Sequence, residues 1–409
     1  MFRKILIANR GEIAVRVIRA CREMGIATVA VYSEADHETL HTQLADECIC
    51  IGPGPVKDSY LHVTNLLSAT VHSGAEAIHP GYGLLSEDEK FARICGQCHI
   101  KFIGPPPDVM QAMGNKLNAR RTMIAAGVPV IPGSEDILRD AAHALAEAER
   151  VGYPVMVKAS AGGGGRGIRR VNGPDELKNA LRACKAEAGA AFGDDSLYLE
   201  KMMEHVRHIE VQVMADQEGH VVHLGERDCS LQYRRQKLVE ESPSVFVDEV
   251  LRERMGAAAV AAARAVHYEG AGTIEFLVDD DQHFYFMEMN TRIQVEHPVT
   301  EMVTGTDIVQ EQIRVAAGLP LSWRQQDIRI TGHALECRVC ANDPEKGFSP
   351  SSGRVKLVHV PGGPGVRFDS YLYNGCMVPA FYDAMVGKII VHAPTRDMAI
   401  ARMKGALSE

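Results

Sequence analysis

The clearest pattern of apolar and polar positions lies between residues 273 and 288. Two short runs, 273–278 and 283–288, alternate between apolar and polar side chains with the two-residue period of a β-strand. The residues between them, Asp-Asp-Asp-Gln at 279–282, are typical of a turn. The pattern therefore predicts a β-hairpin with 279–282 as its loop.

Predicted strands and helices alternate in the N-terminal part of the chain. Short apolar runs predict strands at 4–8, 28–32, 48–51, 75–78 and 101–103. Between the first two, apolar positions recur at helical spacing from residue 13 to residue 24, and Gly25 is typical of a helix C-terminus. These elements predict a doubly wound parallel sheet. The sequence G-x-G-x-x-G is absent, which argues against NAD binding.

A glycine-rich loop separates two further predicted strands within residues 155–168. Glycines occupy positions 162–165, and Lys158 ends the first strand. Glycines let backbone N–H groups approach phosphate oxygens closely, and the lysine adds a positive charge. No G-K-[ST] sequence follows, so this is not a Walker loop. The pattern indicates a flap over a phosphate-bearing ligand, with a plain glycine linker as the alternative.

Three oxygen-bearing side chains belong to the predicted hairpin. With an even-length loop, Glu275 and Glu288 lie on one face as diagonal neighbours, and Asn290 continues the parity of Glu288. Carboxylate and amide oxygens suit Mg²⁺ or Mn²⁺ and the phosphates these ions carry. An odd-length loop places the glutamates on opposite faces and removes the site. A solvated hairpin face without any ligand is the alternative.

The residues after the hairpin carry further charged groups at strand spacing. Arg292, Gln294 and Glu296 then share one face, which places a cation beside a carboxylate. Such a pair suits an anionic substrate, held by the arginine, and a proton acceptor, the glutamate.

These motifs resemble those of the biotin carboxylase family, the ATP-grasp component of biotin-dependent carboxylases. The similarity rests on EMNTRIQVEHP at 288–298, HPGYGLLSE at 79–87, KASAGGGGRG at 158–167 and GERDCSLQYRRQKLVEE at 225–241. It implies an α/β chain with an ATP-grasp fold, an N-terminal doubly wound domain and a C-terminal β-rich domain. The expected domains are residues 1–113, 114–330 with a mobile lid at about 131–203, and 331–409.

The resemblance also implies roles for individual residues. The catalytic residues are Glu296, Arg292, Lys237 and Arg338. Bicarbonate is held by Lys237, Arg292, Gln294, Val295 and Glu296. Biotin lies against Tyr82 and Arg338, and metal is held by Glu275, Glu288 and Asn290. ATP contacts Lys116, Lys158, Gly163, Gly164, Gly165, Glu200, Lys201, Met203, His208, Gln232 and Arg235.

The activity implied is the carboxylation of biotin with ATP and bicarbonate, through carboxyphosphate. The expected cofactor is Mg²⁺ or Mn²⁺, usually two ions, with ATP. An A-M-K-M biotinylation sequence is absent, so the biotin is expected on a separate carrier protein. Carboxyltransferase subunits and a second copy of the chain are further expected partners. The preferred parent complex is acetyl-CoA carboxylase of fatty acid synthesis, with propionyl-CoA or pyruvate carboxylase as alternatives.

Two functional alternatives stay open. One is another ATP-grasp ligase, which shares the metal carboxylates and the glycine flap. The other is an inactive nucleotide-binding scaffold subunit, favoured by two departures from the family pattern. Tyr233 stands where arginine is usual, and Arg235 stands where histidine or asparagine is usual.

Composition adds limits to these expectations. The chain has 409 residues, of which 46% are hydrophobic and 24% charged, typical of a globular protein of two to three domains. A net charge of −9 argues against nucleic-acid binding. No apolar run approaches a membrane span, so a cytoplasmic protein with reduced cysteines is expected. The final helical pattern, 398–407, has no cap, and relatives are expected to continue beyond it.

Overall fold

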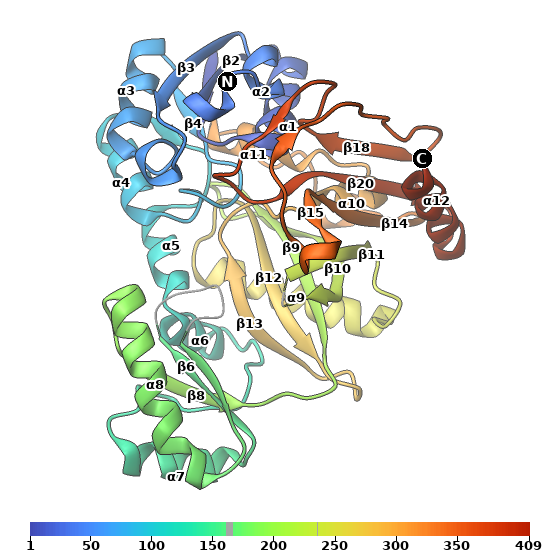
Figure 1. The fold of residues 1–409 in the computed structure, drawn as a ribbon. Coiled ribbons are helices and arrows are strands. Elements are labelled where there is room, and N and C mark those ends of the chain that lie inside the picture. Colours follow the sequence, from blue (N-terminus) through green and yellow to red (C-terminus); the bar gives the residue numbers. More distant parts are fainter. Residues whose placement is uncertain (161–166, 235) are drawn as a thin grey trace.

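The computed structural model describes residues 1–160, 167–234 and 236–409. The predicted ATP contacts Gly163, Gly164, Gly165 and Arg235 therefore lie outside the described residues. Figure 1 shows the N-terminal elements at the top of the molecule, beside the C-terminal ones, with the elements α7, α8, β6 and β8 at the opposite end.

The N-terminal domain contains a parallel sheet of five strands in the order β3-β2-β1-β4-β5. The strands are β1 (Lys4–Ile7), β2 (Ala27–Ser33), β3 (Glu47–Gly52), β4 (Ala77–His79) and β5 (Lys101–Phe102). The accompanying helices are α1 (Gly11–Glu23), α2 (Leu40–Leu44), α3 (Val63–Ser73) and α4 (Glu89–Gln97). Since β1 lies at the centre, the chain winds outward in both directions, which confirms the predicted doubly wound sheet.

An antiparallel sheet of eight strands forms the middle of the molecule, in the order β13-β12-β9-β10-β11-β14-β20-β18. Five of its strands are β9 (Arg207–Ala215), β10 (Val221–Tyr233), β11 (Gln236–Ser242), β12 (Gly270–Val278) and β13 (Phe284–Asn290), of which β13 lies at one edge. The last strands are β14 (His333–Cys340), β18 (Val366–Ser370) and β20 (Met385–Ala393). The segment after residue 331 therefore continues the central sheet, and β14 pairs directly with β11.

Helices cover this sheet and connect it to the N-terminal domain. They are α5 (Pro107–Gly114), α6 (Lys116–Ala125), α9 (Glu249–Ala265), α10 (His297–Thr304), α11 (Ile308–Ala316) and α12 (Arg396–Ser408). Two short pairs, β15 (Asn342–Asp343) with β16 (Ser349–Pro350) and β17 (Gly353–Arg354) with β19 (Met377–Val378), complete the C-terminal part. Among the described residues, no helix is both long and apolar enough to cross a membrane.

A smaller unit contains the strands around the glycine-rich segment. β6 (Val155–Ala159) pairs antiparallel with β7 (Ile168–Val171) and with β8 (Leu197–Lys201). Helices α7 (Ala141–Val151) and α8 (Pro174–Phe192) pack on this sheet and share an apolar core with it. The predicted order of strand, loop and strand is confirmed for the described residues on either side of 161–166.

The hairpin differs from the prediction, because its loop, 279–283, has five residues and not four. The Asp279 carboxylate accepts hydrogen bonds from the backbone N–H of Asp281 (3.1 Å) and His283 (2.9 Å), which stabilise the longer loop. An odd loop alone would separate the two glutamates. The register shifts, however, between the pairs Phe276–Phe286 and Glu275–Glu288. This β-bulge leaves one extra residue, Met287, and returns Glu288 to the face of Glu275.

The predicted diagonal arrangement of the two glutamates is therefore wrong, since they are directly paired across the strands. The strand predicted for residues 292–296 is also wrong. These residues form bends and a turn that lead into α10, whose first turn contains Pro298. Proline favours the first turn of a helix, so it begins α10 here. Ile293 is fully buried and anchors this turn in a core shared with β1, α1 and α11.

Candidate active site

The ammonium group of Lys237 on β11 is the centre of the site. Its Nζ atom lies 2.6 Å from Glu210 on β9, 3.0 Å from Glu275 on β12 and 2.8 Å from Glu296. Strands β9, β11 and β12 bring Glu210, Lys237 and Glu275 to one face of the central sheet, and Glu296 reaches them from the turn before α10. Three buried carboxylates thus surround the ammonium of Lys237, whose side chain is 14% exposed, an arrangement that needs the lysine and its carboxylate partners to remain ionised.

The protonation states follow from this arrangement. Burial alone lowers the pKa of Lys237, but Cys229 and the surrounding carboxylates outweigh it and raise that pKa well above its ordinary value. Burial alone raises the pKa of Glu296, but Lys237, Arg338 and Arg227 hold it well below its ordinary value. Glu296 is therefore an ionised, fully buried carboxylate at neutral pH, available to accept a proton.

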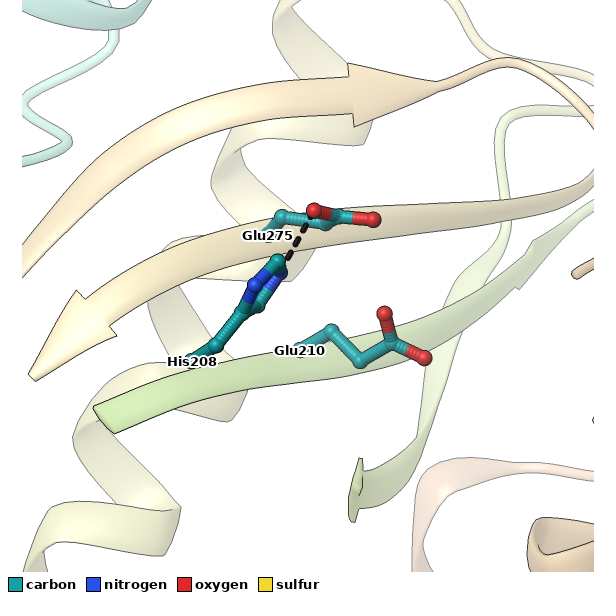
Figure 2. Close-up of side chains that lie close together, drawn as sticks. All are labelled: His208, Glu210 and Glu275. Carbon is teal, nitrogen blue, oxygen red and sulfur yellow. Dashed lines mark hydrogen bonds and ion pairs between the residues drawn. The ribbon is translucent and has the colours of Figure 1, made fainter. Parts of the chain in front are cut away.

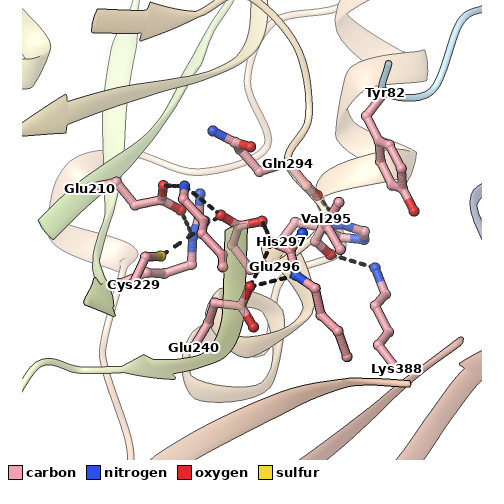
Figure 3. Close-up of polar contacts among 12 residues, drawn as sticks. Tyr82, Glu210, Cys229, Glu240, Gln294, Val295, Glu296, His297 and Lys388 are labelled. Carbon is pink, nitrogen blue, oxygen red and sulfur yellow. Dashed lines mark hydrogen bonds and ion pairs between the residues drawn. The ribbon is translucent and has the colours of Figure 1, made fainter. Parts of the chain in front are cut away.

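Arg338 on β14 lies on the other side of Glu296. Its guanidinium contacts Glu296 at 3.0 Å and Glu240 on β11 at 2.6 Å. One carboxylate, Glu296, therefore contacts both Lys237 and Arg338 (Figure 3 draws the polar contacts around it). The two cations approach it from strands β11 and β14, which are neighbours in the central sheet.

The loop 291–296 brings Arg292 and Gln294 to the same place. Arg292 contacts Glu87 at 2.8 Å and donates to the side-chain oxygens of Asn290 (3.0 Å) and Gln294 (3.2 Å). Gln294 in turn donates to Glu275 at 3.0 Å. The predicted grouping of Arg292, Gln294 and Glu296 is therefore present, although a loop and not a strand produces it.

The predicted metal ligands also lie together. Glu275 and Glu288 face each other across the hairpin, and Asn290 donates to Glu275 at 2.8 Å. Burial and the nearby Glu275 carboxylate raise the pKa of Glu288. Among the described residues, no hydrogen bond reaches the Glu288 carboxylate. Two carboxylates and an amide oxygen, one of them without a partner, fit a hard divalent cation.

A second acidic group overlaps this one. Figure 2 shows His208 and Glu210 on β9 beside Glu275 on β12, with His208 2.6 Å from Glu275. The two oxygens of Glu210, however, already accept hydrogen bonds from Arg227 and Lys237. Glu210 is therefore less suited to a metal ion than Glu288. Glu275 is also occupied, since it contacts His208 and accepts hydrogen bonds from Lys237, Asn290 and Gln294, so Glu288 is the hairpin carboxylate most open to a metal ion.

The comparisons with known proteins agree with this geometry. Three family models match the chain: "Biotin carboxylase, N-terminal domain" at residues 1–110, "Carbamoyl-phosphate synthase L chain, ATP binding domain" at 115–324 and "Biotin carboxylase C-terminal domain" at 336–409. The biotin carboxylases of Bacillus subtilis and Nostoc are each 56% identical, with 100% of this chain and 91% of each relative covered. The chain belongs to the biotin carboxylase family.

Solved structures give the same family and confirm the ATP-grasp architecture. The biotin carboxylase of Campylobacter jejuni matches with a TM-score of 0.97 at 50% identity, over 100% of this chain and 91% of that one. The biotin carboxylase domain dimer of Hydrogenobacter thermophilus 2-oxoglutarate carboxylase, solved with MgADP, ADP and bicarbonate, matches with a TM-score of 0.94. It is 50% identical, over 100% of this chain and 90% of that one.

The residues that the family resemblance assigns to ATP lie in several elements. Lys158 on β6 contacts Glu200 on β8, and Lys116 begins α6 near Glu288. Gln232 donates through Nε2 to the Nδ1 atom of His208 at 3.0 Å. Met203 follows β8. The side chain of Lys201 is directed instead to the carbonyl oxygens of Gly152 (2.8 Å) and Tyr153 (2.9 Å).

The predicted biotin residues line one cavity. Tyr82, Val295 and Arg338 form its wall together with Arg10 and Tyr382, and its volume is about 370 Å³. Arg338 thus faces the cavity and Glu296 at once. This cavity places the biotin residues beside the bicarbonate residues, as a transfer between the two substrates requires.

Several residues of the site were missed in the sequence. They are partners of the predicted residues: Glu12, Glu87, Glu210, Arg227, Glu240 and Lys388. A signal existed for two of them, because Glu210 and Arg227 are charged residues at otherwise buried positions of β9 and β10. A charge in such a position requires a partner of opposite sign.

Proposed function

We propose that this protein carboxylates biotin with ATP and bicarbonate, and that the biotin is carried on a separate protein. The observation that supports this most directly is the position of Glu296. It contacts Lys237, which the family resemblance assigns to bicarbonate, and Arg338, which it assigns to biotin. A single ionised carboxylate between the two substrate sites fits a reaction in which bicarbonate gives up its proton beside biotin.

Bicarbonate binds, in this proposal, among Lys237, Arg292, Gln294 and the backbone of Val295. The two cations and the amide supply donors for three oxygens of an anion. Glu296 accepts the bicarbonate proton, because its low pKa keeps it ionised. The deprotonated bicarbonate attacks the γ-phosphorus of ATP, which forms carboxyphosphate and releases ADP.

Glu275, Glu288 and Asn290 hold the divalent metal in this proposal. The metal supplies neutralisation of negative charge on the phosphates of ATP as the phosphoryl group is transferred. Lys116 lies near Glu288 and adds a further positive charge at this end of the site. His208 contacts Glu275, one of the proposed metal ligands, and Gln232 contacts His208. The proposed nucleotide residues therefore lie next to the hairpin.

Carboxyphosphate then breaks into CO₂ and phosphate, and the phosphate takes the proton from the ureido nitrogen of biotin. The resulting enolate lies beside Arg338, whose positive charge stabilises it. The ureido nitrogen attacks CO₂, which gives carboxybiotin. The sum is ATP, bicarbonate and biotin converted to ADP, phosphate and carboxybiotin. Closure of the lid predicted at about 131–203 would exclude water, which otherwise hydrolyses carboxyphosphate.

We also propose acetyl-CoA carboxylase as the parent complex, with a biotin carrier protein and carboxyltransferase subunits as partners and a homodimer as the assembly. The similarity to a dimeric domain of a 2-oxoglutarate carboxylase supports the dimer and keeps a keto-acid carboxylase as the alternative parent. Reconstitution with the carboxyltransferase of each type, and detection of the carboxylated product, separates the two.

The test is ATP hydrolysis by the purified chain with Mg²⁺, with and without bicarbonate and free biotin. Hydrolysis that requires bicarbonate and rises with biotin is the expected result. Glu296→Gln removes the proton acceptor and is expected to reduce the rate by about 10² to 10⁴. Glu226→Gln is the matched control, since Glu226 is equally buried but pairs with Arg252 on α9, away from Lys237. Bicarbonate-independent hydrolysis would identify a different ATP-grasp ligase.

A further inference from the structure

A chain of polar contacts connects the bicarbonate loop to the biotin cavity. Lys388 on β20 donates through Nζ to the carbonyl oxygen of Val295, and the same atom lies 3.2 Å from the carboxylate of Glu12 on α1. Glu12 accepts a hydrogen bond from the hydroxyl of Tyr82. Figure 3 shows Lys388 pointing toward Val295, with Tyr82 nearby.

The two charged members of this chain are buried from solvent. Lys388 is 0% exposed and Glu12 is 3% exposed. A fully buried ammonium group costs several kcal/mol unless it is paired and hydrogen-bonded. Burial lowers the pKa of Lys388, but Glu12, Glu336 and Asp369 outweigh it and raise that pKa. Lys388 therefore carries a positive charge between carboxylates.

The contacts come from three separate parts of the fold. Lys388 belongs to the last long strand of the central sheet, Glu12 and Tyr82 to the N-terminal domain, and Val295 to the loop before α10. The carbonyl of Val295 is part of the planar peptide that continues into the N–H of Glu296. A hydrogen bond that fixes this carbonyl also fixes the start of Glu296, the proton acceptor.

We propose that Lys388 is a positioning residue that couples the biotin side of the site to the bicarbonate side. This assignment rests on the proposed function. It gives Lys388 no contact with either substrate. Biotin bound against Tyr82 changes the hydrogen bond that the Tyr82 hydroxyl donates to Glu12. Glu12 then holds Lys388 more or less tightly, and Lys388 transmits the difference to the Val295–Glu296 peptide. Occupancy of one substrate site thereby alters the geometry of the other.

The first test variant is Glu12→Gln, which keeps the size of the side chain and removes its charge. Direct removal of Lys388 would leave buried carboxylates unpaired, so that variant risks misfolding. The expected result is a KM for bicarbonate and a KM for free biotin that both rise by about tenfold, the loss expected for one charge-assisted hydrogen bond. The KM for ATP should stay within about twofold of wild type.

The matched control is again Glu226→Gln, because it removes a similarly buried carboxylate charge from an ion pair with Arg252 on α9, outside the contacts that connect Tyr82 to Val295. A role of Glu12 in stability alone predicts a lower melting temperature and a lower amount of active protein, with all three KM values unchanged. That result would overturn the coupling. So would an equal rise in the KM for ATP.

The second variant, Tyr82→Phe, removes only the hydroxyl and keeps the packed ring. Its KM for bicarbonate is measured in the absence of biotin, with the rate of ATP hydrolysis as the signal. A rise of about threefold or more is expected, because the hydroxyl is connected to Val295 through Glu12 and Lys388. An unchanged KM would refute the chain of contacts. If wild type itself shows no bicarbonate-dependent hydrolysis, the proposed function has failed instead.

Discussion

Arg227 offers a stringent test of how the buried charges support the site. Its guanidinium on β10 is 0% exposed and donates to Glu210, to Gln212 (2.8 Å), to Thr300 (3.0 Å) and to Thr273 (3.1 Å). Glu210 uses its second oxygen for Lys237. The substitution Arg227→Met keeps a long, unbranched side chain and removes the charge and every donor.

The magnitude follows from what remains after the substitution. Glu210 keeps Lys237 as its only cation and stays fully buried. Breaking a buried ion pair by removing one partner costs about 3–5 kcal/mol of stability. Lys237 is then drawn toward Glu210 and away from Glu296, so we expect kcat/KM for bicarbonate to fall by at least about tenfold, or about 1.4 kcal/mol.

The assay is a urea titration of folded protein, read by fluorescence or circular dichroism, together with ATP hydrolysis at varied bicarbonate. Arg93→Met is the control, since Arg93 is 45% exposed and its partner Asp108 is 83% exposed. Exposed pairs contribute little, so its unfolding midpoint should stay close to that of wild type. The double variant Glu210→Gln with Arg227→Met should recover part of the loss, because it removes the unpaired carboxylate charge.

The reasoning is refuted if Arg227→Met unfolds at the same urea concentration as Arg93→Met. The single variant Glu210→Gln gives the loss in unfolding free energy that this substitution causes in the wild-type protein. The reasoning is also refuted if Glu210→Gln causes the same loss when it is added to Arg227→Met. Additive losses would mean that the two residues do not act as a pair.

Three further predictions concern separate features of the molecule. Glu288→Gln should weaken Mn²⁺ binding, measured by electron paramagnetic resonance, by at least about tenfold, because one of two anionic ligands is lost; unchanged binding would move the metal away from the hairpin. Arg338→Met should keep the bicarbonate dependence of ATP hydrolysis and lose its stimulation by free biotin. Burial lowers the pKa of His41 from 6.5 to about 4, so only the unfolded chain gains this proton as the pH falls from 6.5 to 4. Stability is lost over that window, and His41→Gln should reduce the loss between pH 6.5 and pH 4.5 by about 2 kcal/mol in urea titrations.

The sequence predicted the elements of the site better than their pairing. The parallel N-terminal sheet followed from apolar runs and helical spacing, which depend only on local side chains. The hairpin loop and its register depended on the Asp279 carboxylate and on a bulge at Met287, neither of which alternation can detect. Two errors of parity, an odd loop and a bulge, cancelled. Glu275 and Glu288 therefore met on one face for a reason that the sequence pattern did not contain.

The partners of the predicted residues were missed because they lie on distant strands. Glu210, Arg227 and Glu240 reach Lys237, Glu296 and Arg338 only through the order of the central sheet. That order places β11 beside β14, although about ninety residues separate them, and no local pattern specifies such a neighbour. The resemblance to a family supplied the substrate residues, whereas the supporting charges required the structure.

The two carboxylates on Arg338 show why residue type alone does not assign the proton acceptor. Both Glu296 and Glu240 are fully buried and both contact the same guanidinium. Burial, only partly offset by Arg338, raises the pKa of Glu240 to about 7, and one of its oxygens has no hydrogen-bond partner among the described residues. Glu296 has Lys237 in direct contact as well, and its pKa falls well below the ordinary value. Near neutral pH, Glu240 thus holds a proton for part of the time, whereas Glu296 is free to accept one. In the proposed reaction, the added cation, and not the carboxylate itself, distinguishes Glu296 as the base.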